Sequence, residues 1–296
     1  MAGMRGAEGR NLGKGLAFLS PWLMGFLVFT LLPVGLSFYY SLCDYSLLQP
    51  PLYVGAANYR DLMADPVFWK ALKNTFWYAL MALPAGMLVS LGLALLLNAP
   101  IGGQAIYRTI IFLPSLVPTV ASAMLWLWLF NAKLGLINTL LGFVGIEGPG
   151  WLTTPEWAMP ALALMSLWGV GHTVVIYLAG LQDVPRELYE AAELDGVGPV
   201  SRLMNVTLPM LSPVIFFNLV MAIIGTLQVF SIPFIMTGGG PARATYFFTM
   251  YLYDNAFTYL KMGYASAMAW IQLLIILCLT GIAFWSSKRW VHYQGT

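Results

Sequence analysis

The residues best suited to chemistry lie in one acidic segment, Glu190-Ala191-Ala192-Glu193-Leu194-Asp195-Gly196, which Leu208-Pro209 follows further along the chain. A carboxylate such as Glu190 can pair with an arginine or lysine of another protein, and small side chains such as Ala191 allow close approach. Gly196 suits the left-handed conformation that ends a helix. This chemistry is recognition of a protein partner. The alternative is a solvated loop whose acids keep it out of lipid, and the pattern alone leaves both open.

Local signals predict two short helices around this segment. The first spans 183–194, with Asp183 as its cap and Pro185 in its first turn. The second spans 199–206, and Pro209 then opens the next hydrophobic run. At helical spacing, the first helix has a charged face of Arg186, Glu190 and Glu193 and a flatter face of Leu188, Ala191 and Ala192.

The whole loop 182–209 holds more acids than bases. Its charged residues are Asp183, Glu187, Glu190, Glu193 and Asp195 against Arg186 and Arg202. A helix that lies on anionic lipid would be basic. The loop is therefore expected to face water and a soluble partner.

The elements that position this loop are membrane helices. Hydrophobic residues make up 59% of the 296 residues and charged residues only 9%, against about 25% charged in soluble domains. Six apolar runs are long enough to cross a bilayer as helices and contain no Asp, Glu, Lys or Arg, namely 16–42, 74–97, 109–130, 158–181, 210–236 and 263–286. The sequence predicts an all-α membrane protein with six transmembrane helices.

Six spans place both termini on one side, and basic residues favour the cytoplasm for them. The inner segments are short and carry Arg5, Arg10, Lys14, Arg108, Arg186, Arg202, Lys288 and Arg289. The outer loops are longer and carry fewer, namely Arg60, Lys70, Lys73, Lys133, Arg243 and Lys261. The expected organisation is a cytoplasmic tail 1–15, a membrane domain 16–286 and a cytoplasmic tail 287–296. The first run is expected to stay as a span, because it is too long for a signal-peptide core.

The loops that are predicted on the outer side also contain signals for local secondary structure. Asp65-Pro66 predicts a helix start, with Asp as the cap. The loop 131–157 is rich in Gly and Pro and is expected to be irregular. Gly238-Gly239-Gly240-Pro241 is expected to terminate the fifth span.

The residue patterns that several other functions require do not occur in this sequence. The string nearest to a phosphate-binding Walker A loop is Gly13-Lys14-Gly15, which has Gly15 where a hydroxyl is needed. No metal-ligand or hydrolase pattern occurs, and Cys43 and Cys278 are expected to be packing residues. Among the apolar runs, His172 is the one ionisable group of the kind that a proton-coupled carrier uses. The net charge of +2 gives no reason to expect nucleic acid.

The string Glu190-Ala191-Ala192, then Gly196, then Val206-Thr207-Leu208-Pro209, resembles the EAA motif of ABC importer permeases, with Val206 where Ile is usual. Nearly the full chain resembles the carbohydrate branch, which includes maltose-type and glycerol-phosphate-type permeases. Further matching strings are Asn58-Tyr59, Asp65 to Trp69, Asn74-Thr75, Phe112-Leu113-Pro114, Leu129-Phe130-Asn131, Gly135 to Asn138, Tyr177 to Leu181, Tyr189 to Asp195 and Thr237 to Pro241.

The resemblance implies the type I ABC importer permease fold with a cytoplasmic coupling helix, in the inner or plasma membrane. It implies a second permease subunit, two ATPase subunits that bind ATP and Mg, and an extracytoplasmic substrate-binding protein. This chain would hold no cofactor and would be a transport subunit, not an enzyme. The residues carried over as the contact with the ATPase are Glu190, Ala191, Ala192, Gly196, Leu208 and Pro209.

A sugar path needs inward polar groups and aromatic faces. The candidates are Asn218, Gln228, Ser231, His172, Tyr177 and Gln272, and for each the alternative is a hydrogen bond between helices. On a continuous fifth helix, Gln228 and Ser231 share a face, and Thr226 points elsewhere. Two other classes of function compete with the importer subunit, namely a self-sufficient secondary carrier and a membrane scaffold. The sequence does not identify the solute.

Overall fold

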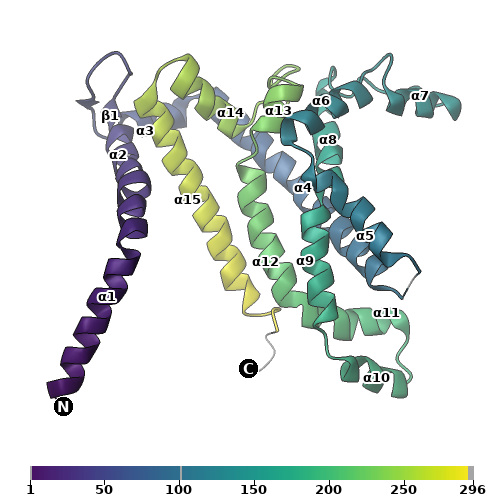
Figure 1. Cartoon of the computed structure of the whole chain (residues 1–296). Coiled ribbons are helices and arrows are strands. Elements are labelled where there is room, and N and C mark those ends of the chain that lie inside the picture. The colour runs from purple at the N-terminus through teal and green to yellow at the C-terminus, as the bar shows by residue number, and fades with distance from the viewer. Residues whose placement is uncertain (1, 101, 293–296) are drawn as a thin grey trace. The chain divides into compact units, whose positions relative to one another are not determined.

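The computed structural model describes residues 2–100 and 102–292 and divides them into two compact units. The first unit holds residues 2–64 and 252–272, and the second holds 65–251 and 273–292. The helices α14 (Phe248–Tyr253) and α15 (Met262–Ser287) contribute residues to both units. Figure 1 labels the elements along the chain. The last four residues of the predicted C-terminal tail, 293–296, lie outside the described residues.

The first unit begins with a long helical segment made of α1 (Ala2–Phe26), a π-helical turn (Leu27–Leu31) and α2 (Leu32–Ser41). In the π turn, the Leu32 N–H donates to the Leu27 carbonyl. The next residue, Pro33, has no N–H to donate. The part Lys14–Ser41 is long and apolar enough to cross a membrane, as the run 16–42 predicts. The helix starts at Ala2, however, within the segment that was expected to be a tail.

A small hairpin follows the first span. Its strands β1 (Cys43–Asp44) and β2 (Leu52–Tyr53) are antiparallel, with Cys43 opposite Tyr53. The next helix, α3 (Ala57–Ala64), holds the hairpin in place. The Asn58 side-chain amide donates to the Ser41 and Cys43 carbonyls at 2.9 and 2.8 Å. The first unit also contains a π turn at Asp254–Thr258.

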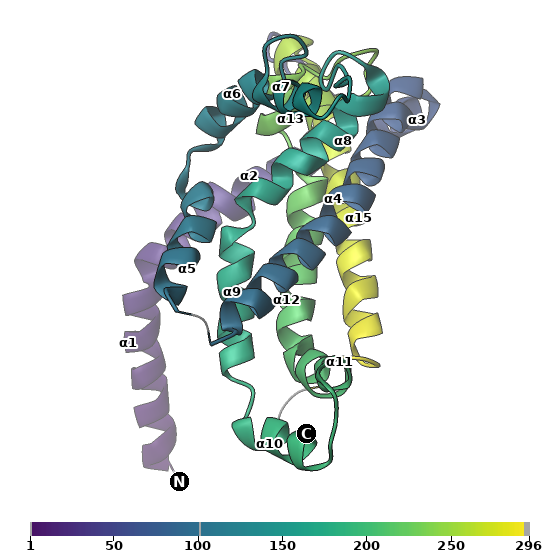
Figure 2. The same ribbon diagram turned by 90° about the vertical axis from the view of Figure 1, so that its right-hand side faces the viewer.

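The second unit is built on α4 (Pro66–Asn98), α9 (Gly171–Gln182) and α12 (Leu208–Leu227), which pack against one another (Figure 2). The predicted start of α4 is confirmed, because the Asp65 carboxylate accepts the Val67 N–H at 2.8 Å. One buried cluster joins these three helices through Ala94, Leu97, Val174, Tyr177, Leu178, Leu181 and Leu211.

Two of the predicted spans, 109–130 and 158–181, are bent, which the apolar runs alone did not indicate. The first consists of α5 (Gln104–Phe112), a 3-10 turn (Leu113–Leu116) and α6 (Thr119–Leu129), with an angle of 98°. The second consists of α8 (Pro155–Ser166), a 3-10 turn (Leu167–Gly169) and α9, with an angle of 50°. The first break falls at Pro114 and Pro118, because a proline ring removes the donor that would continue the helix.

The number of spans agrees with the prediction when each bent pair counts as one span. Four helical segments of the described chain are long and apolar enough to cross a membrane, and the two bent pairs bring the total to six. The four are Lys14–Ser41, Pro66–Asn98, Pro199–Met236 and Met262–Ser287. The all-α membrane fold is therefore confirmed.

The fifth span differs in detail from the predicted run 210–236. Its helical path starts at α11 (Pro199–Arg202), continues through a π turn (Leu203–Thr207) into α12, breaks after Leu227 and resumes as α13 (Ser231–Met236). The separate second helix predicted at 199–206 is therefore wrong, because the π turn carries the helix past Pro209.

Of the loops that were expected on the outer side, one is more ordered than predicted. The loop 131–157 contains α7 (Leu136–Phe143), so the expectation of an irregular loop is wrong. Gly238 and Gly239 take positive φ angles of 56° and 87° just after α13, which confirms the predicted terminator. The Asn74 amide donates to the Arg243 and Tyr246 carbonyls at 2.8 and 3.1 Å and ties this loop to α4.

Candidate functional site

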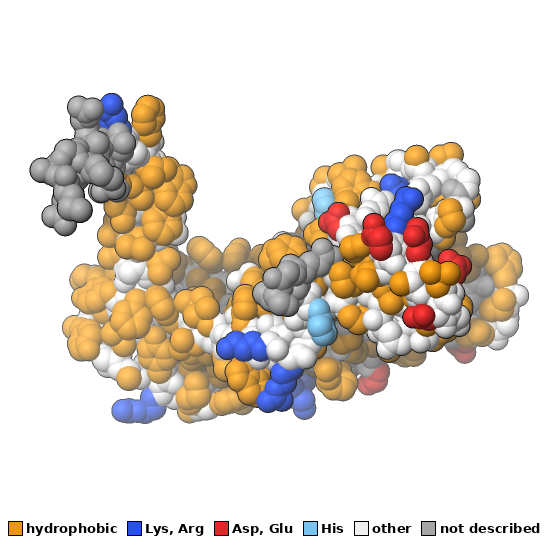
Figure 3. All heavy atoms as spheres, turned by 90° about the horizontal axis from the view of Figure 1, so that it is seen from below, with side chains coloured by type: hydrophobic (Ala, Val, Ile, Leu, Met, Phe, Trp, Pro, Cys, Tyr) orange, Lys and Arg blue, Asp and Glu red, His pale blue; other side chains and the backbone are white. Residues whose placement is uncertain are grey.

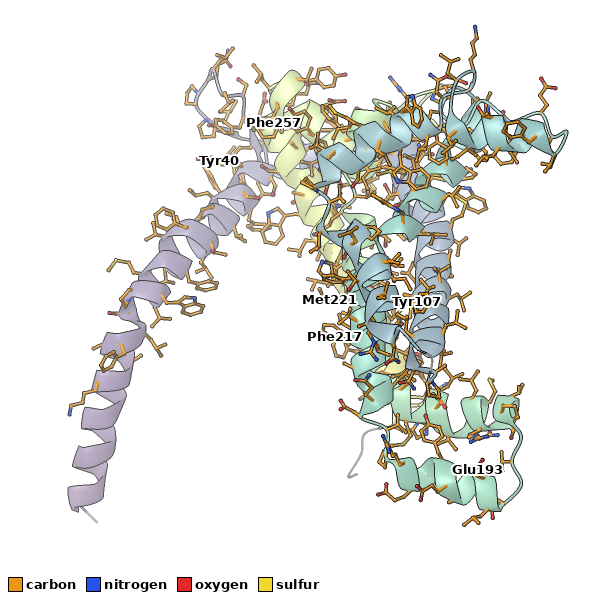
Figure 4. All side chains as sticks on the ribbon, turned by 45° about the vertical axis from the view of Figure 1, so that its right-hand side comes forward. Tyr40, Tyr107, Glu193, Phe217, Met221 and Phe257 are labelled. Atoms are coloured by element: carbon orange, nitrogen blue, oxygen red, sulfur yellow. The ribbon has the colours of Figure 1, made fainter. Side chains whose placement is uncertain are left out.

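The acidic segment forms the helix α10 (Arg186–Leu194), and one side of it packs against the chain. The Tyr189 hydroxyl lies 3.1 Å from the Thr207 hydroxyl, which belongs to the π turn before α12. Ala192 is 8% exposed, and Val184, just before the helix, is 6% exposed. These contacts fix α10 at the end of the second unit where Figure 4 labels Glu193.

The opposite side of α10 faces outward. It carries residues at helical spacing i, i+3, i+4 and i+7, which we call the outer stripe: Glu187, Glu190, Ala191 and Leu194. The charged face predicted at Arg186, Glu190 and Glu193 is exposed, whereas the flatter face of Leu188, Ala191 and Ala192 is only partly buried. Ala192 is buried next to the Tyr189 side, and Ala191 is exposed beside Glu190. The sequence pattern did not include the contact with Thr207, which decides the buried side.

The start of α10 also differs from the prediction. Pro185 is the residue before the first turn, and no side chain caps the helix. Asp183 instead ends α9, where its N–H donates to the Ala179 carbonyl at 3.1 Å. The loop between α9 and α10 is consequently only a few residues long, which couples the position of α10 to that of a membrane helix.

The end of α10 is a Schellman motif, as Gly196 predicts. Gly196 has a φ of +71°, and its N–H donates to the Glu193 carbonyl at 3.0 Å. The Val197 N–H reaches back to the Ala192 carbonyl at 2.9 Å. A Cβ on Gly196 would meet nothing within 4 Å, so the requirement for glycine is the backbone conformation alone.

Leu208 and Pro209 lie at the start of α12 and are half-buried. The Leu208 N–H donates to the Leu203 carbonyl, which is the π-type bond before the proline. The Ser212 hydroxyl donates to the Pro209 carbonyl at 2.6 Å and accepts the His292 N–H at 2.8 Å. This junction therefore links α11, α12 and the C-terminal segment, and neither residue belongs to the outer stripe.

The surface around the outer stripe combines acids with exposed apolar side chains. Leu194 is 90% exposed, Val200 74% and Met204 58%. Figure 3 shows acidic side chains gathered together with apolar ones on this face. Exposed carboxylates beside large exposed apolar groups are suited to a protein interface that has basic residues around an apolar groove.

A second feature lies at the two bends of the second unit. A cavity of about 290 Å³ is lined by residues from both bent pairs and from α13. Its polar and aromatic lining includes Ser115, Thr119, Ser122, Ser166, Trp168 and His172. Both breaks fall near the middle of their spans, where irregular backbone is tolerated only when it is buried in protein or lines an aqueous cavity.

The two aromatic side chains that line this cavity, Trp168 and His172, each pack against another aromatic ring. His172 stands edge-on to Phe112 with ring centroids 5.0 Å apart, and Trp168 packs edge-on to Trp126 at 6.2 Å. Ser115 and Ser166 donate to carbonyls within their own turns at 2.6 Å, which leaves their oxygen lone pairs as acceptors. The arrangement can stack against a sugar ring and accept hydrogen bonds from its hydroxyl groups.

Comparison with known proteins identifies the class of this chain. Residues 82–292 match the family of binding-protein-dependent transport system inner membrane components. The chain belongs to this family. It is an ABC transporter permease and a multi-pass membrane protein.

The relatives and solved structures agree with this assignment. The permease is 42% identical over 285 residues to the probable ABC transporter permease protein YesP of Bacillus subtilis, which covers 95% of this chain and 92% of that protein. It is 36% identical to the sulfoquinovosyl glycerol transport system permease protein SmoG of Agrobacterium fabrum, over 84% of this chain and 82% of that protein. A crystal structure of a bacterial alginate ABC transporter, with an alginate pentasaccharide-bound periplasmic protein, shares its fold with a TM-score of 0.83 at 24% identity, covering 96% of each chain.

The other predicted path residues are dispersed in the permease. Asn218 is 5% exposed, and its amide donates to the Val214 carbonyl of its own helix at 3.0 Å. Tyr177 is 1% exposed within the cluster of α4, α9 and α12. Gln228 and Ser231 do not share a helical face, because the helix ends at Leu227 and restarts at Ser231. Gln272 belongs to the first unit and is half-buried.

Sequence reasoning identified one residue of the cavity, His172, and missed Trp168 and the three serines. The signal that could have found them is the pair of interruptions, Pro114 to Pro118 and Gly169 to Gly171, in the middle of two apolar runs. Gly and Pro breaks at matching depths in two spans are a sequence pointer to a binding site.

Proposed function

We propose that this permease forms half of the translocation pathway for a sugar-like solute and receives ATP-driven motion through α10. Its partners are a second permease, two ATPase subunits that bind ATP and Mg, and an extracytoplasmic binding protein. Both termini and α10 lie on the cytoplasmic side. The observation that supports the proposal best is the outer stripe, where Glu190, Ala191 and the 90%-exposed Leu194 stand on a helix fixed to the membrane domain.

The geometry supports a transfer of force in two ways. The short connection from Gln182 to α10 joins the helix to α9, and the contact of Tyr189 with Thr207 joins it to α12. A displacement of α10 by an ATPase would therefore act on two membrane helices at once. Leu208 and Pro209 lie at the α12 end of this connection and are proposed to transmit the motion.

The substitution Glu190→Lys tests the docking. Reversing one charge of a close ion pair should weaken ATPase binding by about 2 kcal/mol or more, which is about thirtyfold in affinity. The measurement is the amount of ATPase that co-purifies with the variant, together with ATP-driven uptake. Glu147→Lys, an equal charge change on the exposed outer loop, is the control. Normal assembly and normal uptake by the Glu190 variant would refute the docking role.

The solute contact is proposed at the cavity between the bends, with Trp168 as the stacking face and His172 as a polar contact. Relatives of the permease serve transport systems named for lactose and for sulfoquinovosyl glycerol, which favours a carbohydrate-like solute here too. Asn218 and Gln228 stay candidate path residues, of which Gln228 is exposed at the break after α12.

The double substitution Trp168→Ala with His172→Ala tests the cavity. Loss of two ring contacts worth about 0.5–1.5 kcal/mol each, about 1–3 kcal/mol together, should raise the KM for uptake by about five- to 150-fold. ATPase co-purification should not change, because both residues lie in the middle of their spans. Thr280→Val, which removes a hydroxyl from α15 outside the cavity, is the control. An unchanged KM in the double variant would contradict the assignment.

A further inference from the structure

A second cavity lies near the coupling end of the permease, between α4, α5 and α9. It has a volume of about 200 Å³. Its apolar wall includes Leu97, Ile111, Val175 and Leu178, and its polar members are Arg108 and Gln182. Gln182 is the last residue of α9, directly before the connection to α10. The cavity is therefore at the same end of the second unit as the outer stripe.

Arg108 gives this cavity its chemical character. Its Nε atom is buried and has no hydrogen-bond partner among the described residues. A guanidinium has five N–H donors and stays charged, so a buried donor without an acceptor is costly. An anion with several oxygen acceptors, such as a phosphate, would satisfy it in the two-pronged geometry that arginine prefers.

The surroundings indicate that the phosphate belongs to a lipid. Arg108 lies about one helical turn from the start of α5 at Gln104, which is the depth of a headgroup. Its neighbours on the same helix, Ile106 and Ile110, are 64% and 60% exposed, and Val175 of the cavity wall is 47% exposed. Tyr107 is 49% exposed, as is common for aromatic residues at a membrane interface (Figure 4).

We propose that this cavity binds an anionic phospholipid of the inner leaflet, with its phosphate on Arg108 and an acyl chain along Leu97, Ile111 and Val175. The assignment to the inner leaflet rests on the proposed docking of the ATPase at α10. Basic pockets between membrane helices on the cytoplasmic side are suited to such headgroups. The bound lipid would fix the distance between α5 and α9, and α9 leads directly into the coupling helix.

Native mass spectrometry of the delipidated full-length permease tests the proposal. Phosphatidylglycerol and phosphatidylcholine with identical acyl chains are titrated separately. We expect phosphatidylglycerol to bind at least about tenfold more tightly to the unmodified chain, and Arg108→Gln to remove that preference. Lys288→Gln, the same loss of charge at an exposed position of the C-terminal segment, should retain it. Equal binding of the two lipids, or a preference that survives Arg108→Gln, would overturn the proposal.

Two further arms separate the alternatives. Ala179→Phe should fill the cavity and abolish the preference while Arg108 keeps its charge, and tight binding in that variant would contradict the location. Millimolar inorganic phosphate should not displace phosphatidylglycerol; full displacement would show that a free anion is the ligand. A preference that disappears in the assembled transporter would show that a partner chain covers the cavity. ATPase co-purification should be normal in Arg108→Gln, so a failure of this proposal is distinct from a failure of the docking role.

Discussion

Gly196 ends α10 in a left-handed backbone conformation that favours glycine. Its φ of +71° lets two N–H groups return to carbonyls of α10 and turns the chain toward α11. There is open space for a side chain, so a substitution there would change conformation without a clash. The position therefore separates the shape of α10 from its surface chemistry.

We predict that Gly196→Ala weakens ATPase binding about five- to thirtyfold. An alanine in the left-handed region costs about 1–2 kcal/mol, and the helix end must form to present Leu194. Gly196→Asn should lose less, because asparagine tolerates this region. The control is Gly198→Ser, at φ −67° and the start of α11, where serine is favoured. The measurement is the affinity of the solubilised permease for the ATPase, and equal affinities in the three variants would contradict the argument.

At the scale of elements, close helix packing connects α9 and α12, the two helices that hold α10. Gly180 of α9 faces α12 so closely that a Cβ would lie 2.7 Å from Val214 Cγ2 and 2.8 Å from Leu211 Cδ1. Leu211 is fully buried and Val214 is stiff at χ1, so neither can move easily. The two helices that hold α10 therefore depend on this glycine for their separation.

Gly180→Ala should destabilise the permease by about 1–3 kcal/mol, because overpacking pushes α9 away from α12. The expected result is a lower midpoint of thermal unfolding in detergent and reduced transport per complex. Gly225→Ala is a matched control, because it lies in α12 with nothing within 4 Å of its Cβ. If the two variants unfold at the same temperature, the close contact does not limit stability.

Elements whose ends are set by neighbouring cap or turn residues were predictable from the sequence. Asp65-Pro66 starts α4, and Gly196 ends α10, because caps and left-handed turns are local properties. The six apolar runs were predictable for the same reason, since hydropathy is a sum over neighbouring residues.

Elements that depend on distant contacts were not predictable. The contact of Tyr189 with Thr207 decides which side of α10 is buried, and the helical pattern alone did not assign a buried side. A hydropathy window does not register bends, so the angles of 98° and 50° were not predicted, although Pro114, Pro118 and Gly169 mark the breaks. The cavity lining comes from both bends, and most of it was therefore missed.

At the scale of the whole molecule, the two long spans of the second unit leave most of their surface open. The most apolar windows of Pro66–Asn98 and Pro199–Met236 are 22% and 17% buried. Lipid covers such surface as well as protein does, but a pathway for a polar solute must be closed on all sides by polar-lined protein. This low burial is consistent with a chain that forms half of a pathway, which a second permease completes.

The permease alone should therefore not transport. Its six apolar runs contain no Asp, Glu, Lys or Arg with which to couple solute movement to an ion gradient. In proteoliposomes that hold this chain alone, a proton or sodium gradient should produce no sugar accumulation above empty vesicles. Addition of the second permease, the ATPase, internal ATP with Mg and external binding protein should give uptake that vanadate inhibits. Gradient-driven accumulation by the single chain would favour the self-sufficient carrier, whereas binding of the ATPase without uptake by the full set would favour a scaffold.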